Sequence, residues 1–341
     1  MLPPREEKDV HLRRRRGRLS WRGWDAFEIR DDDVSLVVVP DLGAKVVSLY
    51  HRTTGREWLY NDARRPLREA VENAVYEDYD LSGWDECFPS VGTGLYPPTP
   101  PWAGTPLPDH GEIWGRRWSV AVTATRIRCS IDGASLPYRF TREIEVLGGG
   151  RIGWSYWVDN SGDDPIIHGW SAHPLLAIDA GVRIHCEAVP MHREFGDGRR
   201  VAASEETETA WDWPHASAGG QSTDLSVLRP TDGVADKVVL DTPSDGRIQV
   251  EDLDRRAWLR FDVPPSDVPF IGVCSNGGSW PVDMPQRWLA IEPTMATTDD
   301  LCRSWLRKAY GEVPAHGRSS WGFRTTVGPT STDRAVVAGR R

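Results

Sequence analysis

The sequence lacks long hydrophobic runs, paired cysteines and an excess of positive charge, and each absence excludes a class of protein. No window approaches the roughly 18 consecutive apolar residues of a membrane-spanning helix. The five cysteines are widely separated, without the paired spacing that zinc sites use, which is typical of reduced thiols in the cytosol. With 50 acidic and 41 basic residues, the chain is a poor candidate for nucleic-acid binding.

The basic residues are concentrated at the N-terminus. Residues 1–22 contain eight Arg or Lys and three acidic residues. The run from Arg13 to Arg16 has no interleaved aromatic residues, and no apolar segment of a secretory signal follows it. We therefore expect residues 1–18 to form a basic flexible tail rather than a nucleic-acid patch or a signal, and the protein to be cytoplasmic.

Uninterrupted helical patterns are scarce, because 32 Gly and 26 Pro punctuate the chain. Residues 67–75 and 299–310 are the best helix candidates. Thr297 or Thr298 is expected to cap the second of these helices, and Gly311 follows its end.

Strand patterns, in contrast, recur along the chain. Residues 34–40 and 44–50 are apolar runs around a short turn and predict a hairpin. Residues 118–122, 140–146 and 152–158 alternate with a period of two. Short alternating strands separated by turns predict an all-β protein, a single large antiparallel β-sandwich with few short helices.

Two later motifs place a titratable side chain beside apolar residues. Glu292 ends an apolar run, so burial would raise the pKa of its carboxyl toward that of a useful base. His173 precedes Pro174, which favours an extended backbone at a strand end or edge. A histidine and a carboxylate held on strands suit acid–base catalysis, although a structural histidine and a carboxylate paired with arginine are the alternatives.

A third motif surrounds His110. It lies in a turn where Asp109 or Glu112 would fix the tautomer of its ring. Gly104, His110 and Glu112 also faintly match a cupin metal-ligand pattern, with glutamate in a place where that pattern has histidine. Direct ligand binding and metal binding both remain open for this motif.

Five motifs occur in a specific order: Gly83-Trp84-Asp85-Glu86-Cys87-Phe88-Pro89, Asp109-His110-Gly111-Glu112, His173-Pro174, Ile291-Glu292-Pro293 and Gly317-Arg318-Ser319-Ser320-Trp321. Over residues 34–323 this order resembles the aldose 1-epimerase (galactose mutarotase-like) superfamily. The resemblance implies the galactose mutarotase-like supersandwich and interconversion of the α and β anomers of an aldose, without a cofactor or metal.

The resemblance also implies roles for individual residues. Glu292 would take the proton of the anomeric hydroxyl, and His173 would protonate the ring oxygen. His110 would bind sugar oxygens, and Asp236 would bind sugar hydroxyls. One residue of the adjacent pair Asp85 and Glu86 is expected to point into the cleft.

Tryptophan is unusually frequent, with 17 Trp against 7 Phe and 8 Tyr. An indole can cover the apolar face of a pyranose and still donate a hydrogen bond. Most of these residues are expected in the core, and the candidates for a sugar platform lie nearest the motifs: Trp84, Trp114, Trp170, Trp211 and Trp280. With these, the predicted substrate-binding residues are His110, Asp85, Glu86, Glu112, Asp236, Trp84, Trp114 and Trp170.

The chain departs from the family pattern in two places. An arginine is missing before the first motif, where Leu81-Ser82-Gly83-Trp84 stands, and Pro174-Leu175-Leu176 replaces aromatic residues after the acid histidine. The first change weakens a sugar-phosphate interpretation, because arginine is suited to clamping phosphate. Both changes predict a divergent branch.

These patterns together predict residues 19–328 to be one catalytic β-sandwich domain and residues 329–341 to be a flexible C-terminal tail. The expected partner is a small-molecule sugar, with no nucleic acid or membrane, and the protein would be a monomer or homodimer. Three other functions stay open: a non-catalytic carbohydrate-binding protein, a cupin-like metal enzyme, and a carbohydrate lyase or hydrolase on a similar sandwich.

Overall fold

The fold consists almost entirely of antiparallel strands, as predicted. A computed structural model describes residues 19–178, 181–196, 198–201, 211–228 and 233–330. The predicted tails, residues 1–18 and 329–341, lie outside the described residues except for residues 329 and 330. No helix in the described ranges is both long and apolar enough to cross a membrane.

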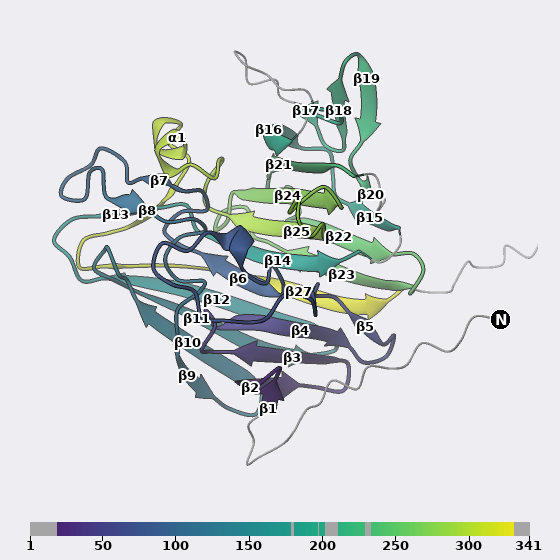
Figure 1. The fold of residues 1–341 in the computed structure, drawn as a ribbon, viewed down its shortest axis with the longest axis horizontal. Coiled ribbons are helices and arrows are strands. Elements are labelled where there is room, and N and C mark those ends of the chain that lie inside the picture. The colour runs from purple at the N-terminus through teal and green to yellow at the C-terminus, as the bar shows by residue number, and fades with distance from the viewer. Residues whose placement is uncertain (1–18, 179–180, 197, 202–210, 229–232, 331–341) are drawn as a thin grey trace, which may run out of the picture.

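The larger sheet has twelve strands and carries the candidate site. The strands, in spatial order, are β1 (Leu19–Trp21), β2 (Trp24–Arg30), β3 (Val34–Val39), β4 (Lys45–His51), β6 (Trp84–Cys87), β14 (Ser171–Ala177), β25 (Arg287–Thr294), β24 (Phe270–Gly277), β21 (Ala235–Asp241), β16 (Pro190–Gly196) and β17 (Trp211–Asp212), with β5 (Arg56–Glu57) paired to β4. In Figure 1 the N-terminal strands lie at one edge, β16 and β17 lie at the other, and β6, β14 and β25 are central.

The second sheet has nine strands. Its strands, in spatial order, are β20 (Val227–Leu228), β15 (Val182–His185), β22 (Arg247–Asp252), β23 (Ala257–Asp262), β27 (Arg318–Pro329), β12 (Arg151–Asn160), β11 (Tyr138–Gly148), β10 (Arg126–Asp132) and β9 (Ser119–Val122). The hairpin predicted around residues 41–43 is confirmed as β3 and β4, and the three alternating segments are confirmed as β9, β11 and β12.

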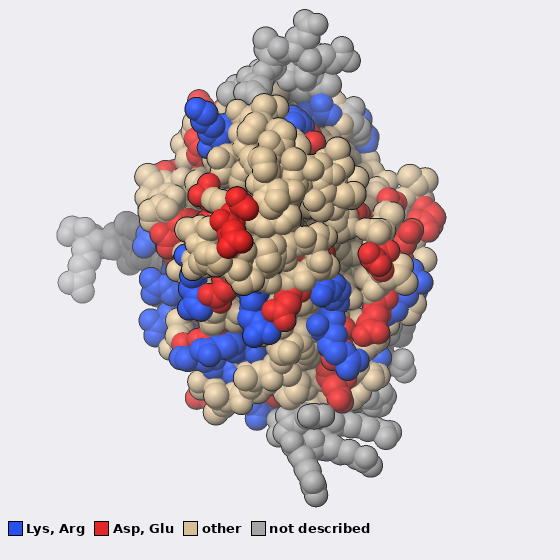
Figure 2. Space-filling view, turned by 90° about the vertical axis from the view of Figure 1, so that its left-hand side faces the viewer, with Lys and Arg blue, Asp and Glu red and all other residues tan. Residues whose placement is uncertain are grey.

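The remaining elements are short. Three two-stranded pieces pair β7 (Gly94–Leu95) with β8 (Pro106–Leu107), β13 (Ile166–His168) with β26 (Gly311–Val313), and β18 (His215–Ala218) with β19 (Gln221–Asp224). The helices described are η1 (Tyr76–Asp78) and α1 (Leu301–Leu306). Figure 2 shows one side of the molecule, where positive and negative side chains are intermixed in the lower half and uncharged residues cover most of the upper half.

Both helix predictions need correction. Residues 67–75 form turns and irregular backbone, so the helix predicted there is wrong. Within this segment Leu67 and Ala74 are buried, and Ala74 packs beside Trp114 and Leu175, whereas Val71 and Val75 are exposed. In the second case α1 is shorter than predicted, and Asp300 rather than a threonine is its cap, because its Oδ1 accepts the Arg303 N–H at 2.9 Å.

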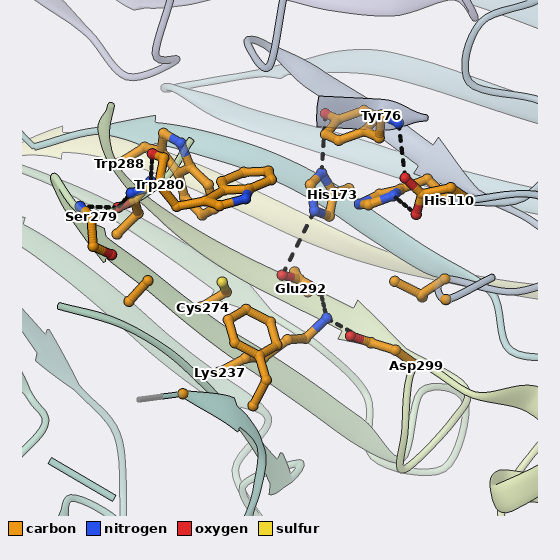
Figure 3. A pocket seen from close by; sticks show the side chains of 17 residues that line it. Tyr76, His110, His173, Lys237, Cys274, Ser279, Trp280, Trp288, Glu292 and Asp299 are labelled. Carbon is orange, nitrogen blue, oxygen red and sulfur yellow. Dashed lines mark hydrogen bonds and ion pairs between the residues drawn. The ribbon is translucent and has the colours of Figure 1, made fainter. Parts of the chain in front are cut away.

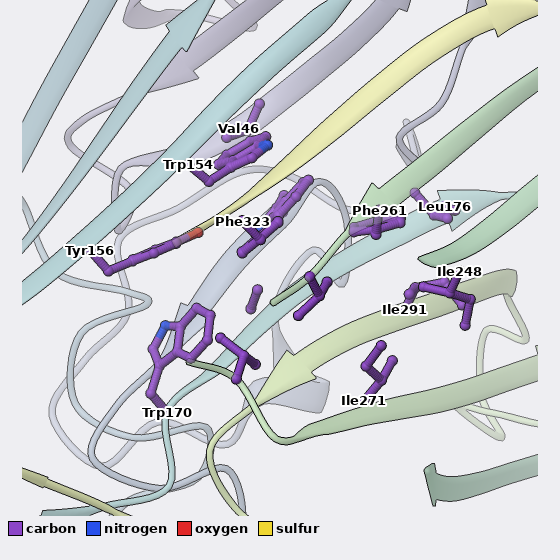
Figure 4. Packing of buried hydrophobic residues seen from close by; sticks show 14 of the residues in the cluster. Val46, Trp154, Tyr156, Trp170, Leu176, Ile248, Phe261, Ile271, Ile291 and Phe323 are labelled. Atoms are coloured by element: carbon purple, nitrogen blue, oxygen red, sulfur yellow. The ribbon is translucent and has the colours of Figure 1, made fainter. Parts of the chain in front are cut away.

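The core lies between the two sheets and is rich in aromatic rings (Figure 4). Trp84 from β6 stacks on Trp154 from β12, with ring centroids 3.9 Å apart, and Phe323 from β27 stacks beside them. Because neighbouring residues of a strand point to opposite faces, packing this set inward turns the intervening residues of β6, β14, β25 and β21 outward. Those outward residues form the candidate site.

Candidate functional site

A cavity of about 630 Å³ opens on the outer face of the large sheet. It lies over the central strands, and side chains from several strands and loops converge on it (Figure 3). Its described lining residues are Tyr76, Val91, Gly92, Asp109, His110, His173, Phe195, Gly196, Ala235, Lys237, Cys274, Asn276, Ser279, Trp280, Trp288, Glu292 and Asp299. His173 and Glu292, the two predicted catalytic residues, are both among them, and so is His110, which was predicted to bind sugar oxygens.

Strand register places His173 and Glu292 side by side. The pairs between β14 and β25 are Ser171 with Thr294 and, further along, Leu175 with Ala290, so His173 lies directly across from Glu292. His173 is therefore in the interior of a central strand, and its predicted position at a strand end or edge is wrong. Pro174 is tolerated there because the cross-strand pairing of β14 with β25 is interrupted between Ser171 and Leu175.

Glu292 belongs to a buried chain of charges. Its Oε2 accepts a hydrogen bond from Lys237 Nζ at 2.7 Å, and the same ammonium binds Asp299 Oδ1 at 2.7 Å. Burial raises the pKa of the Glu292 carboxyl, the Lys237 ammonium lowers it, and Asp299 raises it, with a net pKa above the usual value. Glu292 Oε1 has no hydrogen-bond partner among the described residues and lies 3.9 Å from His173 Nε2.

Gly272 on β24 makes room for this charged pair. It is the cross-strand neighbour of Glu292, and a Cβ on Gly272 would lie 3.2 Å from Glu292 Oε2 and 3.3 Å from the Lys237 Cε. A larger residue would have to displace one of the two side chains. The missing side chain of Gly272 thus helps to set the position of the carboxylate.

His173 is surrounded by groups that disfavour its charged form. Burial lowers its pKa well below the usual value, and the positive charges of His110, Lys237 and Lys45 act in the same direction. Its Nδ1 lies 3.4 Å from the hydroxyl of Tyr76. At neutral pH the imidazole is therefore mostly neutral, and the imidazolium, when it forms, is a strong acid.

Behind His173, Tyr76 connects the imidazole to Asp85. The Tyr76 hydroxyl donates to Asp85 Oδ2 at 3.0 Å, and Lys45 Nζ lies 3.1 Å from the same oxygen. Burial raises the pKa of Asp85 to about 6, although Lys45 lowers it. Lys45 also binds Asp80 Oδ2 at 2.7 Å, so these charges compensate one another beneath the site.

His110 is fixed over the cavity by Asp109 and by its backbone. Asp109 Oδ1 lies 2.8 Å from His110 Nδ1, and the other oxygen accepts the Tyr76 N–H at 2.8 Å. Burial raises the pKa of Asp109, but the hydrogen bond to His110 and the charge of its ring outweigh this and lower it. The His110 ring also stacks on Tyr76, with ring centroids 4.0 Å apart. Because Asp109 contacts Nδ1, the other ring nitrogen, Nε2, takes no part in that contact.

The next residue explains the sharp turn that carries His110. Gly111 has a φ of +74°, and a Cβ there would lie 2.2 Å from the carbonyl oxygen of Phe88. Only glycine fits such a close approach to β6. The Glu112 N–H then donates to this same carbonyl at 2.8 Å, which ties the loop to the end of the strand.

The other end of the cavity is aromatic. Trp280 and Trp288 lie on the side of Glu292 opposite to His110 in Figure 3, with ring centroids 6.1 Å apart in an edge-to-face arrangement. Asn276, which is fully buried, accepts the backbone N–H groups of residues 278, 279 and 280 and donates to the carbonyl of Trp280. This side chain fixes the loop that carries Trp280.

Three predicted binding acids point away from the cavity. Glu86 is inside the core, where Arg142 Nη1 donates to it at 3.0 Å. Asp236 binds Arg200 on the opposite face of β21. Glu112 accepts from the backbone N–H groups of residues 134 and 135 and from Tyr138. Because side chains alternate along a strand, the neighbour in sequence takes the outward place in two of these cases, Asp85 beside Glu86 and Lys237 beside Asp236.

The tryptophans are divided in the same way. Trp280 lines the cavity, as predicted for a platform, and Trp288 was not predicted. Trp84 and Trp170 are fully buried, and Trp170 donates to Glu86 at 2.9 Å, so their positions do not suit a sugar platform. Trp114 packs edge-on behind Tyr76, and Trp211 lies on β17; neither lines the cavity.

Several site residues had weak signals in the sequence. Lys237 interrupts an apolar strand with a charge, and this was a usable signal. Asp299 was assigned to the first turn of a helix, and it lies before α1. Tyr76 and Trp288 stand in no motif, so their place in the site depends on tertiary packing.

The cupin-like alternative required His110 and Glu112 to share a metal. His110 faces the cavity, whereas both carboxylate oxygens of Glu112 are bound by residues 134, 135 and 138. In the described part of the chain, no group of three or more His, Cys, Asp or Glu side chains has an arrangement that could hold a metal ion. The donor set present therefore does not fit a cupin centre.

Comparison with known proteins identifies the class of fold. No protein-family model and no curated protein match the chain. Its structure is similar to the Slr1438 protein from Synechocystis sp. PCC 6803, with a TM-score of 0.63 and 17% identity over 90% of this chain and 96% of that chain. The chain therefore shares its fold with that protein.

Two further structures specify that group. A galactose mutarotase related enzyme from Lactobacillus acidophilus gives a TM-score of 0.63 at 14% identity, over 90% of this chain and 98% of that chain. A galactose mutarotase-like protein from Clostridium acetobutylicum gives 0.61 at 13% identity, over 90% and 96%. The fold is thus the galactose mutarotase-like sandwich, and the resemblance inferred from the ordered motifs is confirmed at the level of the fold.

Proposed function

We propose that the protein is an aldose 1-epimerase-like mutarotase, which interconverts the α and β anomers of a reducing sugar. The observation that carries this proposal is the pair formed by His173 and Glu292 on adjacent strands, with Nε2 and Oε1 3.9 Å apart in an open cavity. The unpartnered Oε1 is the atom placed to accept a proton from a ligand. The fold shared with galactose mutarotase-like proteins supports the same activity.

The reaction needs one base and one acid on the same ring. The Glu292 carboxylate accepts the proton of the C1 hydroxyl while the His173 imidazolium donates a proton to the ring oxygen, and the bond between C1 and that oxygen breaks. Rotation about the C1–C2 bond then exposes the other face of the aldehyde. The reverse transfers close the ring and return both protons, so the enzyme is unchanged and the sugar differs only in its anomeric configuration.

The electrostatics of the site strengthen both groups. A raised pKa makes the Glu292 carboxylate a stronger base, and a lowered pKa makes the His173 imidazolium a stronger acid. As a consequence, only a small fraction of molecules has Glu292 as the carboxylate and His173 as the imidazolium at the same time. His110, whose ring centroid lies 4.9 Å from that of His173, would bind sugar oxygens and hold the ring during the reaction.

The test is anomer exchange measured by saturation-transfer NMR across a panel of aldoses, with and without chelator. We expect exchange that chelator does not change, and the Glu292→Gln variant should lose it by a factor of at least about 100. Glu145→Gln is the matched control, since Glu145 lies on the nine-stranded sheet and pairs with Arg126 at 2.7 Å. An exchange rate in the Glu292→Gln variant equal to that of the wild type would remove Glu292 from the mechanism. If chelator removed a bound metal and the activity together, metal catalysis would be favoured instead.

A further inference from the structure

The cavity is longer than one sugar ring. Trp288 lies four residues before Glu292 on β25, so the two side chains emerge from the same face. Four residues of an antiparallel strand span roughly 13 Å. A pyranose ring is only a few ångströms across, so a ring held at Glu292 leaves the Trp288 end of the floor uncovered. The volume of about 630 Å³ is also in the middle of the range of roughly 300–1,000 Å³ that is typical of pockets for drug-sized ligands.

The space between these two residues lies over small and apolar side chains. Ala290 lies midway along β25 and is fully buried, and its cross-strand neighbour on β24 is Cys274. Cys274 lines the cavity together with Glu292, Trp280 and Trp288, so one cavity extends from the acid–base pair to the aromatic end.

The aromatic end of the cavity is preorganised. Trp280 stands edge-to-face with Trp288, and the buried Asn276 side chain holds the loop from residue 278 to residue 280 through several hydrogen bonds. An amide this deeply buried and fully used is typical of a binding site whose shape is set before the ligand arrives. Indole rings present the flat apolar surface that covers the face of a second pyranose.

The charge of the cavity selects against anions. Among its described lining residues, Asp109, Glu292 and Asp299 are acidic, and Lys237 is the one Lys or Arg. Lys237 already binds two of these carboxylates at 2.7 Å each. Among these described lining residues, a phosphate or uronate would therefore meet three carboxylates and no Lys or Arg that is not already paired with a carboxylate.

We propose that the ligand is an uncharged saccharide of at least two rings with a free reducing end. The reducing ring lies at His173 and Glu292, and the next ring stacks on Trp280 and Trp288. This inference rests on the proposed mutarotase function for the first ring and adds a second binding position for the ring that follows it.

The test compares kcat/KM for anomer exchange between disaccharides and the monosaccharides that form their reducing ends, with glucose, galactose and mannose ends. We expect at least one disaccharide to exceed its monosaccharide by about tenfold, and Trp280→Ala to reduce that ratio by roughly five- to tenfold. Val282→Ala, in the same loop with an 86% exposed side chain, should leave the ratio unchanged. The 6-phosphates of the same sugars should exchange more slowly than the neutral forms.

Three results would overturn the proposal. The first is that no disaccharide has a higher kcat/KM than the monosaccharide that forms its reducing end. The other two are that Trp280→Ala lowers kcat/KM equally for disaccharides and monosaccharides, or that the sugar 6-phosphates exchange faster than the neutral sugars. If no sugar is exchanged, the mutarotase function fails, and calorimetry still tests the second position. Disaccharide binding that Trp280→Ala weakens would support it, and the absence of disaccharide binding to the wild-type protein would refute it.

Discussion

Removing the charge of Lys237 should slow the reaction by changing how readily Glu292 gives up its proton. Lys237 Nζ lies 2.7 Å from Glu292 Oε2, so at an effective dielectric constant of about 20 the gross attraction is about 6 kcal/mol. Even a quarter of this, about 1.5 kcal/mol, corresponds to slightly more than a tenfold change in the proton equilibrium. Lys237→Met should therefore raise the pKa of Glu292 further and lower its carboxylate fraction at least about tenfold below that pKa. Because Lys237 also lowers the pKa of His173, the variant gains some imidazolium, and the net loss of rate should be smaller than the loss of carboxylate.

A substitution of Asp299 should shift the pKa of Glu292 in the opposite direction and is therefore a matched control. The Lys237 ammonium lowers the pKa of Glu292, whereas the Asp299 carboxylate raises it. Asp299→Asn should thus lower the pKa of Glu292, increase the fraction of carboxylate at a given acidic pH, and speed exchange there. Lys237→Arg keeps the charge and should retain more activity than Lys237→Met.

The assay is anomer exchange as a function of pH, together with a ¹³C NMR titration of the glutamate carboxyl groups. Circular dichroism checks that the Lys237→Met variant is folded, since breaking a buried ion pair costs about 3–5 kcal/mol. Rates that change in the same direction in the Lys237→Met and Asp299→Asn variants, or a titration of Glu292 that neither variant shifts, would refute the electrostatic reasoning.

Two further predictions test the packing around the site. Gly272→Ala should displace Glu292 or Lys237, because its Cβ would lie 3.2 Å from Glu292 Oε2. We expect a roughly tenfold slower anomer exchange with an unchanged melting temperature. Full activity in this variant would show that the contact is relieved without consequence. Glu86→Ala leaves Arg142 buried without its counter-charge and should destabilise the protein by about 3–5 kcal/mol in urea unfolding, while a loss below about 1 kcal/mol would contradict the assigned structural role.

The pattern of residues along the chain was enough to predict the class of fold and to single out three residues that lie in one cavity. Period-two alternation and frequent turn residues predicted an antiparallel sandwich, because one buried face per strand leaves that signature in any sequence. The ordered motifs singled out His110, His173 and Glu292, which the structure brings into one cavity. Local turn chemistry also predicted the hairpin of β3 and β4 correctly.

Tertiary structure alone decided which neighbour faces the site. Asp85 and Glu86 are adjacent, as are Asp236 and Lys237, and a shift of one residue moves a side chain to the other face of a sheet. Only the packing of the core against the second sheet sets that choice, and it turned Glu86 toward Arg142.

The same dependence holds for the segments that cover the site. Residues 67–75 were predicted to be helical, but they form turns and irregular backbone, and the contacts of the buried Ala74 with Trp114 and Leu175 outweigh local helix propensity. Tyr76 and Trp288 occur in no motif, and their places depend on contacts with distant parts of the chain: Tyr76 contacts His173, and Trp288 pairs across strands with Ala177. Local sequence therefore determined the strands and singled out three residues that line the cavity, while long-range packing, which no local pattern encodes, decided the walls and charges around them.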